Sequence, residues 1–165
     1  MNIKTFITGG TVEKEYNELT GKLSFKKSHL LEMLNQGRAR LKIDIRTLMM
    51  IDSLDMKEED RRIILHNCKK AKEDKIIIIH GTDTMVETAR LLGKKIKNKT
   101  VVLTGAMVPY KFGISDSLFN LGCALAFVQT LQKGVYVAMN GRCFNWNNVR
   151  KNKKIGEFEE IKKNS

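Results

Sequence analysis

Short, unbroken apolar runs alternate along the chain with longer stretches in which apolar residues recur every three or four positions. Runs of the first kind predict buried strands, and stretches of the second kind predict amphipathic helices. The clearest strand is "KIIIIH" at 75–80, a β-branched run typical of strands that are buried on both faces of a parallel sheet. The clearest helix is 55–73, where Ile64, Leu65 and Cys68 share one face.

The same pattern predicts elements along the whole chain. The expected strands are 2–8, 41–51, 75–80, 100–106 and 134–141. The expected helices are 28–34, 55–73, 85–96 and 116–132. Gly37 is available to end the first helix, and Asp55 stands three residues before Glu58, a spacing typical of a capping box at the start of the second. The charged tail, 150–165, is expected as an extension or a short helix.

Strands that alternate with helices imply right-handed βαβ units. We therefore predict the α/β class, with a three-layer, doubly wound and mostly parallel sheet of the Rossmann/flavodoxin-like kind. The chain has a single proline and no Ser/Gly-rich linker, so 1–165 is interpreted as one domain. A chain of 165 residues can bury a real core without disulfides or metal.

Charge changes this interpretation little. The net charge is +12, from 30 Lys and Arg against 18 Asp and Glu. The excess is mostly lysine scattered over helix faces and turns, and the densest piece, "RKNKK" at 150–154, carries no glycine-aromatic signature of RNA binding. A solvated basic surface is therefore favoured over nucleic-acid binding. No apolar stretch approaches the roughly 20 residues that span a bilayer, and Met1 runs straight into a strand pattern, so we expect a cytoplasmic protein with no membrane partner.

The cysteines argue against a metal site or a disulfide framework. Cys68, Cys123 and Cys143 are odd in number and widely spaced, no CxxC occurs, and no histidine stands at zinc spacing. Free thiols in a reducing compartment are the interpretation that fits.

Polar residues directly follow the carboxyl ends of several predicted strands. Thr8-Gly9-Gly10-Thr11 follows the first strand, Asp52-Ser53 the second, and Gly81-Thr82-Asp83-Thr84 the third. Ligands of open parallel sheets bind beyond the carboxyl ends of the strands, so these residues are candidates for a site. Each motif alone also fits a tight turn or a helix N-cap. Neither GxGxxG nor GxxxxGK[ST] is present, which weakens dinucleotide and P-loop interpretations.

The residue types at these strand ends suit acyl transfer. A threonine hydroxyl is a poor nucleophile unless a base or a charged partner activates it. Lysine can act as that base, an aspartate can orient the lysine, and backbone amides of a glycine turn can hold an oxyanion. Thr11, Thr82, Asp83 and a lysine would suffice for acyl transfer on an amide, although spacing alone does not bring them together.

The motifs "TGGTV" at 8–12, "HGTDTMVETA" at 80–89 and "VVLTGAMVP" at 101–109 resemble those of the bacterial-type L-asparaginases. "DSLFNL" at 116–121 and "GVYVAMNG" at 134–141 extend the resemblance to about Lys154. The resemblance implies the N-terminal domain of that family and hydrolysis of asparagine, or sometimes glutamine, to the acid and ammonia. It also implies a homo-oligomer, dimer or tetramer, and no cofactor.

The resemblance assigns roles to individual residues. Thr11 matches the nucleophile that forms an acyl-enzyme, and Tyr16 would lie on a mobile loop that closes over it. Lys151 would pair with Thr82 and Asp83 to activate a hydroxyl or water. The expected substrate-binding residues are Gly10, Ser53, Thr82 and Asp83.

The chain also departs from the family pattern. Where the family has Ser-Gln-Asp, this chain has Ser53-Leu54-Asp55, and Asp52 replaces a usual glycine. The resemblance covers only the family's N-terminal domain, so we expect the C-terminal domain, which supplies an acidic residue to the site, to be absent. Another chain or a tail carboxylate would have to supply that residue; the tail offers Glu157, Glu159 and Glu160.

Three functional hypotheses remain. The first, favoured because Thr11, Thr82, Asp83 and Lys151 are present together, is an amidohydrolase of asparaginase type acting on a small amino-acid amide. The second is a binding module that keeps the pocket without the chemistry. The third is one subunit of a larger amidotransferase-like assembly.

Overall fold

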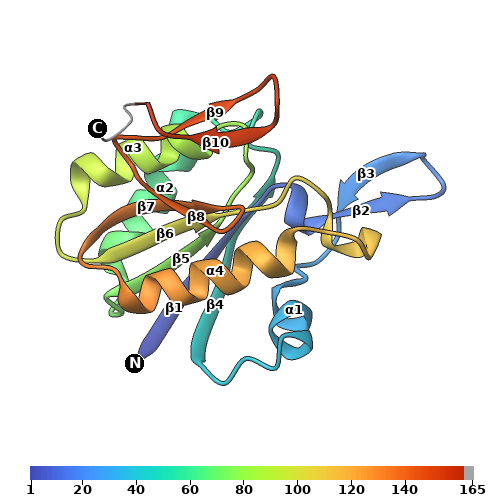
Figure 1. The fold of residues 1–165 in the computed structure, drawn as a ribbon. Helices are drawn as coiled ribbons and strands as arrows, with labels where there is room; N and C mark the ends of the chain where they lie inside the picture. Colours follow the sequence, from blue (N-terminus) through green and yellow to red (C-terminus); the bar gives the residue numbers. More distant parts are fainter. Residues whose placement is uncertain (162–165) are drawn as a thin grey trace.

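The five predicted strands and a sixth that the pattern did not predict, at 142–145, form one sheet in the computed structural model, which describes residues 1–161 (Figure 1). Its strands are β1 (Asn2–Gly9), β4 (Lys42–Ile51), β5 (Lys75–Ile79), β6 (Thr100–Thr104), β7 (Gly134–Met139) and β8 (Arg142–Asn145). They lie in the order β4-β1-β5-β6-β7-β8. The first five are parallel, and β8 runs antiparallel to β7 at the edge. The chain thus leaves the centre toward β4, returns to β5 and continues outward. This order confirms the doubly wound sheet and puts its switch point between β1 and β5.

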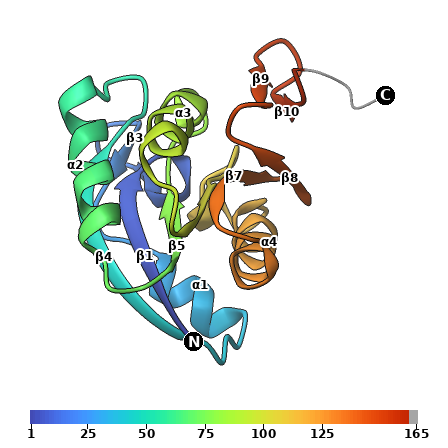
Figure 2. The same ribbon diagram turned by 90° about the vertical axis from the view of Figure 1, so that its left-hand side faces the viewer.

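Helices cover both faces of the sheet, which gives the expected three layers (Figure 2). They are α1 (Leu30–Gln36), α2 (Glu58–Lys70), α3 (Met85–Lys95) and α4 (Ser117–Thr130). The helices α2 and α3 pack on one face, and α1 and α4 pack on the other. Gly37 follows α1 directly and donates its N–H to the Met33 carbonyl, as expected of the residue that ends this helix.

The run "IIII" in β5 explains why this strand is central. Side chains alternate between the faces of a strand, so successive isoleucines serve different layers. Ile76 and Ile78 belong to the core under α2 and α3, whereas Ile77 and Ile79 belong to the core under α1 and α4. All four are at most 1% exposed. A strand that is apolar throughout can be stable in water only between two helical layers.

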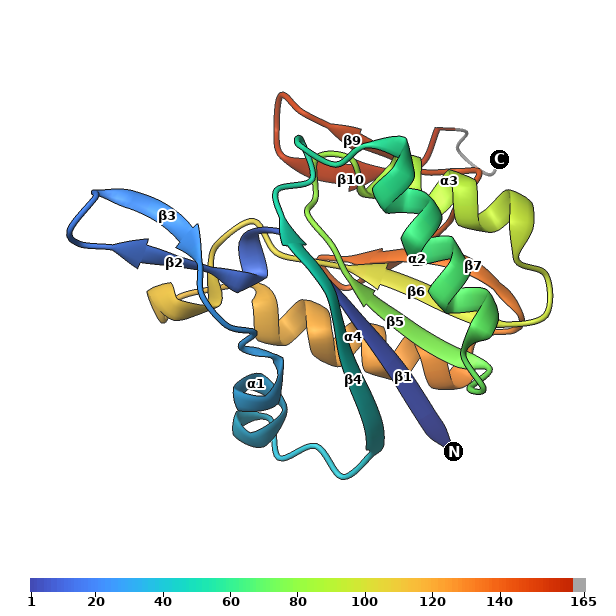
Figure 3. The same cartoon turned by 180° about the vertical axis from the view of Figure 1, so that it is seen from behind.

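Two hairpins stand outside the main sheet. The first, β2 (Lys14–Asn17) with β3 (Lys22–Phe25), projects away from the body of the molecule (Figures 1 and 3). The second, β9 (Arg150–Asn152) with β10 (Glu157–Glu159), is the extension expected for the tail. Residues 162–165, which the tail prediction included, lie outside the described residues. Two short 3-10 helices, η1 (Thr11–Glu13) and η2 (Tyr110–Phe112), complete the fold.

The capping box predicted at Asp55 and Glu58 is wrong. Residues 52–55 form a turn in which the Asp55 N–H donates to the Asp52 carbonyl, so α2 begins later, at Glu58. Its N-cap is Lys57, whose N–H donates to the Asp60 carboxylate at 2.8 Å. The backbone N–H of Asp55 is used in this turn and cannot take part in a capping box. Ser53 lies in the same turn, just after the end of β4.

The three cysteines are free, and two of them have pKa values raised by burial. Burial raises the pKa of Cys68 to about 12 and that of Cys143 to about 11, so both thiols stay protonated near neutral pH. No helix within residues 1–161 combines the length and the apolar character needed to cross a membrane.

Candidate active site

The glycines that end β1 bring two strand ends into contact. Gly9 and Gly10 have φ angles of 101° and 82°, in the left-handed region that glycine adopts without a Cβ penalty. A Cβ on Gly9 would lie 2.3 Å from the Ile51 carbonyl oxygen, and one on Gly10 would lie 2.4 Å from the Gly81 nitrogen. Only glycine therefore permits this approach, which joins "TGGT" to the end of β4 and to the "HGTDT" motif.

The two threonines of "TGGT" have different surroundings. Thr8 is fully buried, and its hydroxyl donates to the Ile79 carbonyl at 2.8 Å, which fastens β1 to β5. Thr11 is only partly buried and begins η1. Because Gly10 touches Gly81, Thr11 and Thr82 each directly follow one of two contacting residues. The structure thus brings these two threonines to the same strand-end region.

Lys151 lies at the centre of the polar contacts here. Its Nζ donates to Thr82 Oγ1 at 2.8 Å and to Asp83 Oδ1 at 2.7 Å. Its side chain is 9% exposed, so this lysine is not another solvated surface cation. The hairpin that carries it is held to the core by Val149 and Phe158, both nearly fully buried. Lys151 is therefore in direct contact with two other predicted site residues, the consecutive Thr82 and Asp83, from which it is far in sequence.

Ser53 presents a buried hydroxyl beside the same strand end. It is 1% exposed, and a Cβ added to Gly81 would lie 2.6 Å from its Oγ. Within residues 1–161 this Oγ has no hydrogen-bond partner. A buried hydroxyl without a partner is unfavourable by roughly 1–3 kcal/mol, so a ligand group that paired with it would gain stability. The Ser53 carbonyl accepts a 2.7 Å bond from the Thr84 hydroxyl, which fixes the turn.

Asp52 and Leu54, the two residues beside Ser53 that differ from the family pattern, have different surroundings. The Asp52 carboxylate accepts from the Lys14 ammonium, and the Leu54 N–H donates to it at 3.0 Å. Partial burial alone would raise the pKa of Asp52, but these two donors hold the pKa below its ordinary value. The extra charge is thus neutralised within the protein. Leu54, where the family has glutamine, is 65% exposed.

Tyr16 stands on β2 rather than on a loop, and it pairs with Leu23 across the projecting hairpin. Its side chain is 58% exposed. Of the three tail carboxylates, Glu159 accepts from Arg150 at 2.9 Å, and Glu157 is exposed on the same strand. Glu160, which follows β10, is partly buried.

His80 has a structural role that its place in the "HGTDT" motif did not indicate. It is fully buried, with Nδ1 and Nε2 each 2.8 Å from a partner, the Gly81 carbonyl and the Thr88 hydroxyl. Because a carbonyl only accepts, Nδ1 carries the proton and Nε2 accepts from Thr88. Burial lowers the pKa of His80 to about 4, so it is neutral near pH 7 and braces the turn that carries Thr82.

A second group that sequence reasoning missed holds the ends of β6 and β7. Asp116 accepts the N–H groups of Met107 and Val108 at 3.0 Å. Asn120, fully buried, donates to the Gly105 carbonyl and accepts from the Asn140 N–H. The Met107 sulfur lies 3.6 Å from Thr82 Oγ1. The motif "DSLFNL" was the available signal, since its Asp and Asn stand four residues apart on one helix face.

Comparisons with known proteins identify the family. The family model described as "Asparaginase, N-terminal" matches residues 2–161. An L-asparaginase of Thermococcus kodakarensis is 32% identical over 161 aligned residues, which cover 94% of this chain and 49% of that protein. A subunit of the glutamyl-tRNA(Gln) amidotransferase of the same organism is 34% identical over 141 aligned residues, which cover 81% of this chain and 32% of that subunit.

A solved structure is similar over nearly the whole chain. The thermostable L-asparaginase from Thermococcus kodakarensis superposes with a TM-score of 0.87 at 31% identity. The match covers 98% of this chain and 51% of that one. The chain thus spans about half the length of the L-asparaginases that it matches.

Proposed function

The chain belongs to the asparaginase family, and from that membership we propose that it is an amidohydrolase acting on a small side-chain amide. The substrate class is asparagine or a related amino-acid amide, and the products are the acid and ammonia. The observation that carries the proposal is the contact of Lys151 with Thr82 and Asp83, at 2.8 and 2.7 Å. A lysine that reaches both groups from the far end of the chain suits catalysis better than surface solvation.

In this proposal Thr11 is the nucleophile. Its Oγ bonds to the amide carbon, the C–N bond breaks, and the hydroxyl proton goes to the departing nitrogen, which leaves as ammonia. Water then attacks the resulting ester, the C–Oγ bond breaks, and a proton of the water returns to Thr11. Backbone N–H groups at this strand end would stabilise the oxyanion in both steps, but not that of Gly10, which already donates to the Ile51 carbonyl at 3.1 Å.

In the same proposal, Thr82, Asp83 and Lys151 would carry out the proton transfers. The Lys151 ammonium bridges the Thr82 hydroxyl and the Asp83 carboxylate, so a proton can pass between a water on Thr82 and the lysine–aspartate pair. Asp83 is the more exposed partner, with 37% of its side chain accessible, and could also receive the ammonium group of an amino-acid substrate. Ser53 and the Gly10 backbone would complete substrate binding.

Tyr16 would have to move to take part. Its exposed position on the β2–β3 hairpin fits a residue that closes over the site after substrate binds. We further propose that the protein is cytoplasmic and forms a homo-oligomer, a dimer or a tetramer. The free cysteines support the first point, since reduced thiols are typical of the cytoplasm.

Ammonia release from asparagine, glutamine and simple amides tests the proposal. We expect purified protein to release ammonia from at least one of them, and Thr11→Ala to abolish the release without unfolding the protein. Full turnover in Thr11→Ala would remove Thr11 as the nucleophile.

Two alternatives each have one observation in their favour. The exposed Leu54 in place of glutamine favours a binding module, which would show a thermal shift with amino acids and no ammonia release. The similarity to a subunit of an amidotransferase favours one component of a larger assembly, whose activity would appear only when a partner chain is added.

A further inference from the structure

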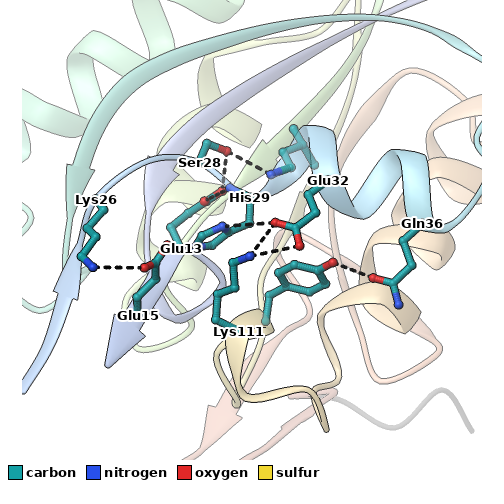
Figure 4. Close-up of polar contacts among 10 residues, drawn as sticks. Glu13, Glu15, Lys26, Ser28, His29, Glu32, Gln36 and Lys111 are labelled. Carbon is teal, nitrogen blue, oxygen red and sulfur yellow. Dashed lines mark hydrogen bonds and ion pairs between the residues drawn. The ribbon is translucent and has the colours of Figure 1, made fainter. Parts of the chain in front are cut away.

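A fully buried carboxylate stands two residues after Thr11. Glu13 ends η1 and has no exposed surface. Its Oε2 accepts the His29 N–H at 2.7 Å, and its Oε1 accepts from the Ser28 hydroxyl at 3.0 Å (Figure 4). The Ser28 Oγ in turn accepts the Leu30 N–H at 3.1 Å. The carboxylate therefore joins the 3-10 turn that starts at Thr11 to the beginning of α1.

Stability alone gives little reason to bury this group. Burial raises the pKa of Glu13, and its two hydrogen bonds offset part of that desolvation. A buried charge with good partners adds little net stability, and an apolar residue of similar size is often as good. A charge kept inside the protein next to a proposed nucleophile calls for another role, and fixing geometry is the one that its contacts suit.

The turn is held at both of its ends. The Glu13 N–H donates to the Gly10 carbonyl at 3.1 Å, which closes the turn on the side of the sheet. The Glu13 carboxylate holds the other side to α1, and Leu30 and Met33 anchor that helix in the core, each 1% exposed. Thr11 lies between the two fixed points, so its orientation depends on both.

The surrounding titratable groups make a second set of contacts, and all of them except the fully buried His29 are more exposed than Glu13. They are Glu15 on β2, Lys26 after β3, His29 and Glu32 at α1, and Lys111 on η2 (Figure 4). Lys111 pairs with Glu32 at 2.7 Å, and His29 Nε2 lies 3.0 Å from Glu15 without hydrogen-bond geometry. These contacts tie the base of the hairpin to α1 and η2, whereas the two bonds that the Glu13 carboxylate accepts go only to Ser28 and His29.

We propose that Glu13 is a positioning residue: its carboxylate fixes the Thr11–Glu13 turn against α1 and so aims the Thr11 hydroxyl at the substrate carbon. This inference rests on the proposed function for its kinetic consequence. The geometric part, that the carboxylate immobilises the turn, can be measured whether or not the protein hydrolyses an amide.

The experiment compares Glu13→Gln with Glu15→Gln. Both remove one negative charge from the same cluster, but only the first removes an acceptor of the turn. We measure ammonia release from asparagine and amide hydrogen exchange of residues 10–14. For Glu13→Gln we expect kcat to fall about tenfold with KM within twofold, and exchange at the Glu13 N–H to be about tenfold faster. Glu15→Gln should match the wild type in both.

Each outcome decides the proposal. Unchanged exchange in folded Glu13→Gln overturns it, whatever the activity, and so does an equal effect of Glu15→Gln. If Glu13→Gln does not fold, Ser28→Ala keeps the carboxylate and removes one donor; a smaller rise in exchange of the same amides supports the proposal, and no rise overturns it. If the wild type releases no ammonia, the proposed function fails while the exchange data still decide the role of Glu13 in the turn.

Discussion

At the scale of single residues, the site depends on Gly10. Its backbone is in the left-handed region, and a Cβ on it would overlap the backbone nitrogen of Gly81. Two separate penalties therefore oppose a side chain here: the φ angle and the overlap with backbone. Gly21, in the hairpin turn, has a φ of 66°, but a Cβ placed on it would meet no atom within 4 Å, so it carries only the first penalty.

We predict that Gly10→Ala and Gly21→Ala differ sharply. Gly21→Ala should lower the free energy of unfolding by about 1 kcal/mol, the usual cost of a left-handed alanine. Gly10→Ala should lower it by about 3 kcal/mol or more, because backbone must also move. Urea denaturation of both variants measures the difference. Equal losses of unfolding free energy in the two variants would mean that the contact between Gly10 and Gly81 has room for a Cβ.

Lys151 carries the proton-transfer proposal at the same scale. We predict that Lys151→Met lowers ammonia release by at least about 100-fold, as expected on losing a general acid–base group. Lys153→Met, two residues along in the same hairpin and exposed, is the matched control and should retain wild-type release. A Lys151→Met protein that is folded and fully active would exclude the lysine from the chemistry.

At the scale of elements, the β9–β10 hairpin supplies the lysine and α3 supports the chain that leads to it. Trp146, in the connection between β8 and β9, packs directly on Gly93 of α3. A Cβ on Gly93 would lie 2.2 Å from the indole ring, so the helix has glycine where the ring needs the space. The position of the hairpin over the strand ends thus depends on a glycine in α3 that leaves space for the Trp146 ring.

Alanine should have opposite effects in two helices. Gly93→Ala should destabilise the protein by roughly 2–3 kcal/mol, because the rigid indole cannot move aside cheaply. Gly122→Ala, on the exposed face of α4 with nothing within 4 Å, should stabilise it by about 0.5–1 kcal/mol through helix propensity. Thermal and urea unfolding measure both signs, and a neutral Gly93→Ala would show that Trp146 does not hold the hairpin.

At the scale of the whole molecule, stability should depend on pH mainly through buried groups. The folded pKa of His80 is about 4, below its unfolded value near 6.5, so the unfolded chain binds the proton first on acidification. Stability is therefore lost as the pH falls from about 6.5 to 4. Glu13, whose folded pKa is raised, acts in the opposite direction and reduces the loss in the lower part of this range. Cys68 acts on the alkaline side, where its raised pKa makes stability fall above about pH 9.

We predict a loss of about 3 kcal/mol from His80 between pH 6.5 and pH 4. Urea titrations across this range measure it in the wild type and in His80→Gln. The variant should be less stable at neutral pH but have a flatter dependence on pH, because the titrating group is gone. An unchanged slope in the variant would assign the acid sensitivity to other groups.

Much of the fold followed from local patterns, for physical reasons that individual elements make clear. The "IIII" run could be stable only between two layers, and the alternation of strands with helices left few ways to connect them. The start of α2 was predicted wrongly because Asp55, the expected cap residue, belongs to a turn in which its own N–H donates to the Asp52 carbonyl, so the helix begins later, at Glu58. Short polar motifs fit several local structures, and contacts with distant residues choose among them.

The sequence by itself determined the class of fold, the strand ends that carry polar residues and, through resemblance, the family. Those properties depend on periodicity and on motifs a few residues long. The resemblance predicted that Lys151 pairs with Thr82, and the packing of the β9–β10 hairpin is what makes that contact. Only the tertiary structure decided that Glu13 is buried against α1 and that Tyr16 faces solvent. Contacts between residues as far apart as Thr82 and Lys151 depend on how hairpins and helices pack, and no local pattern encodes that packing.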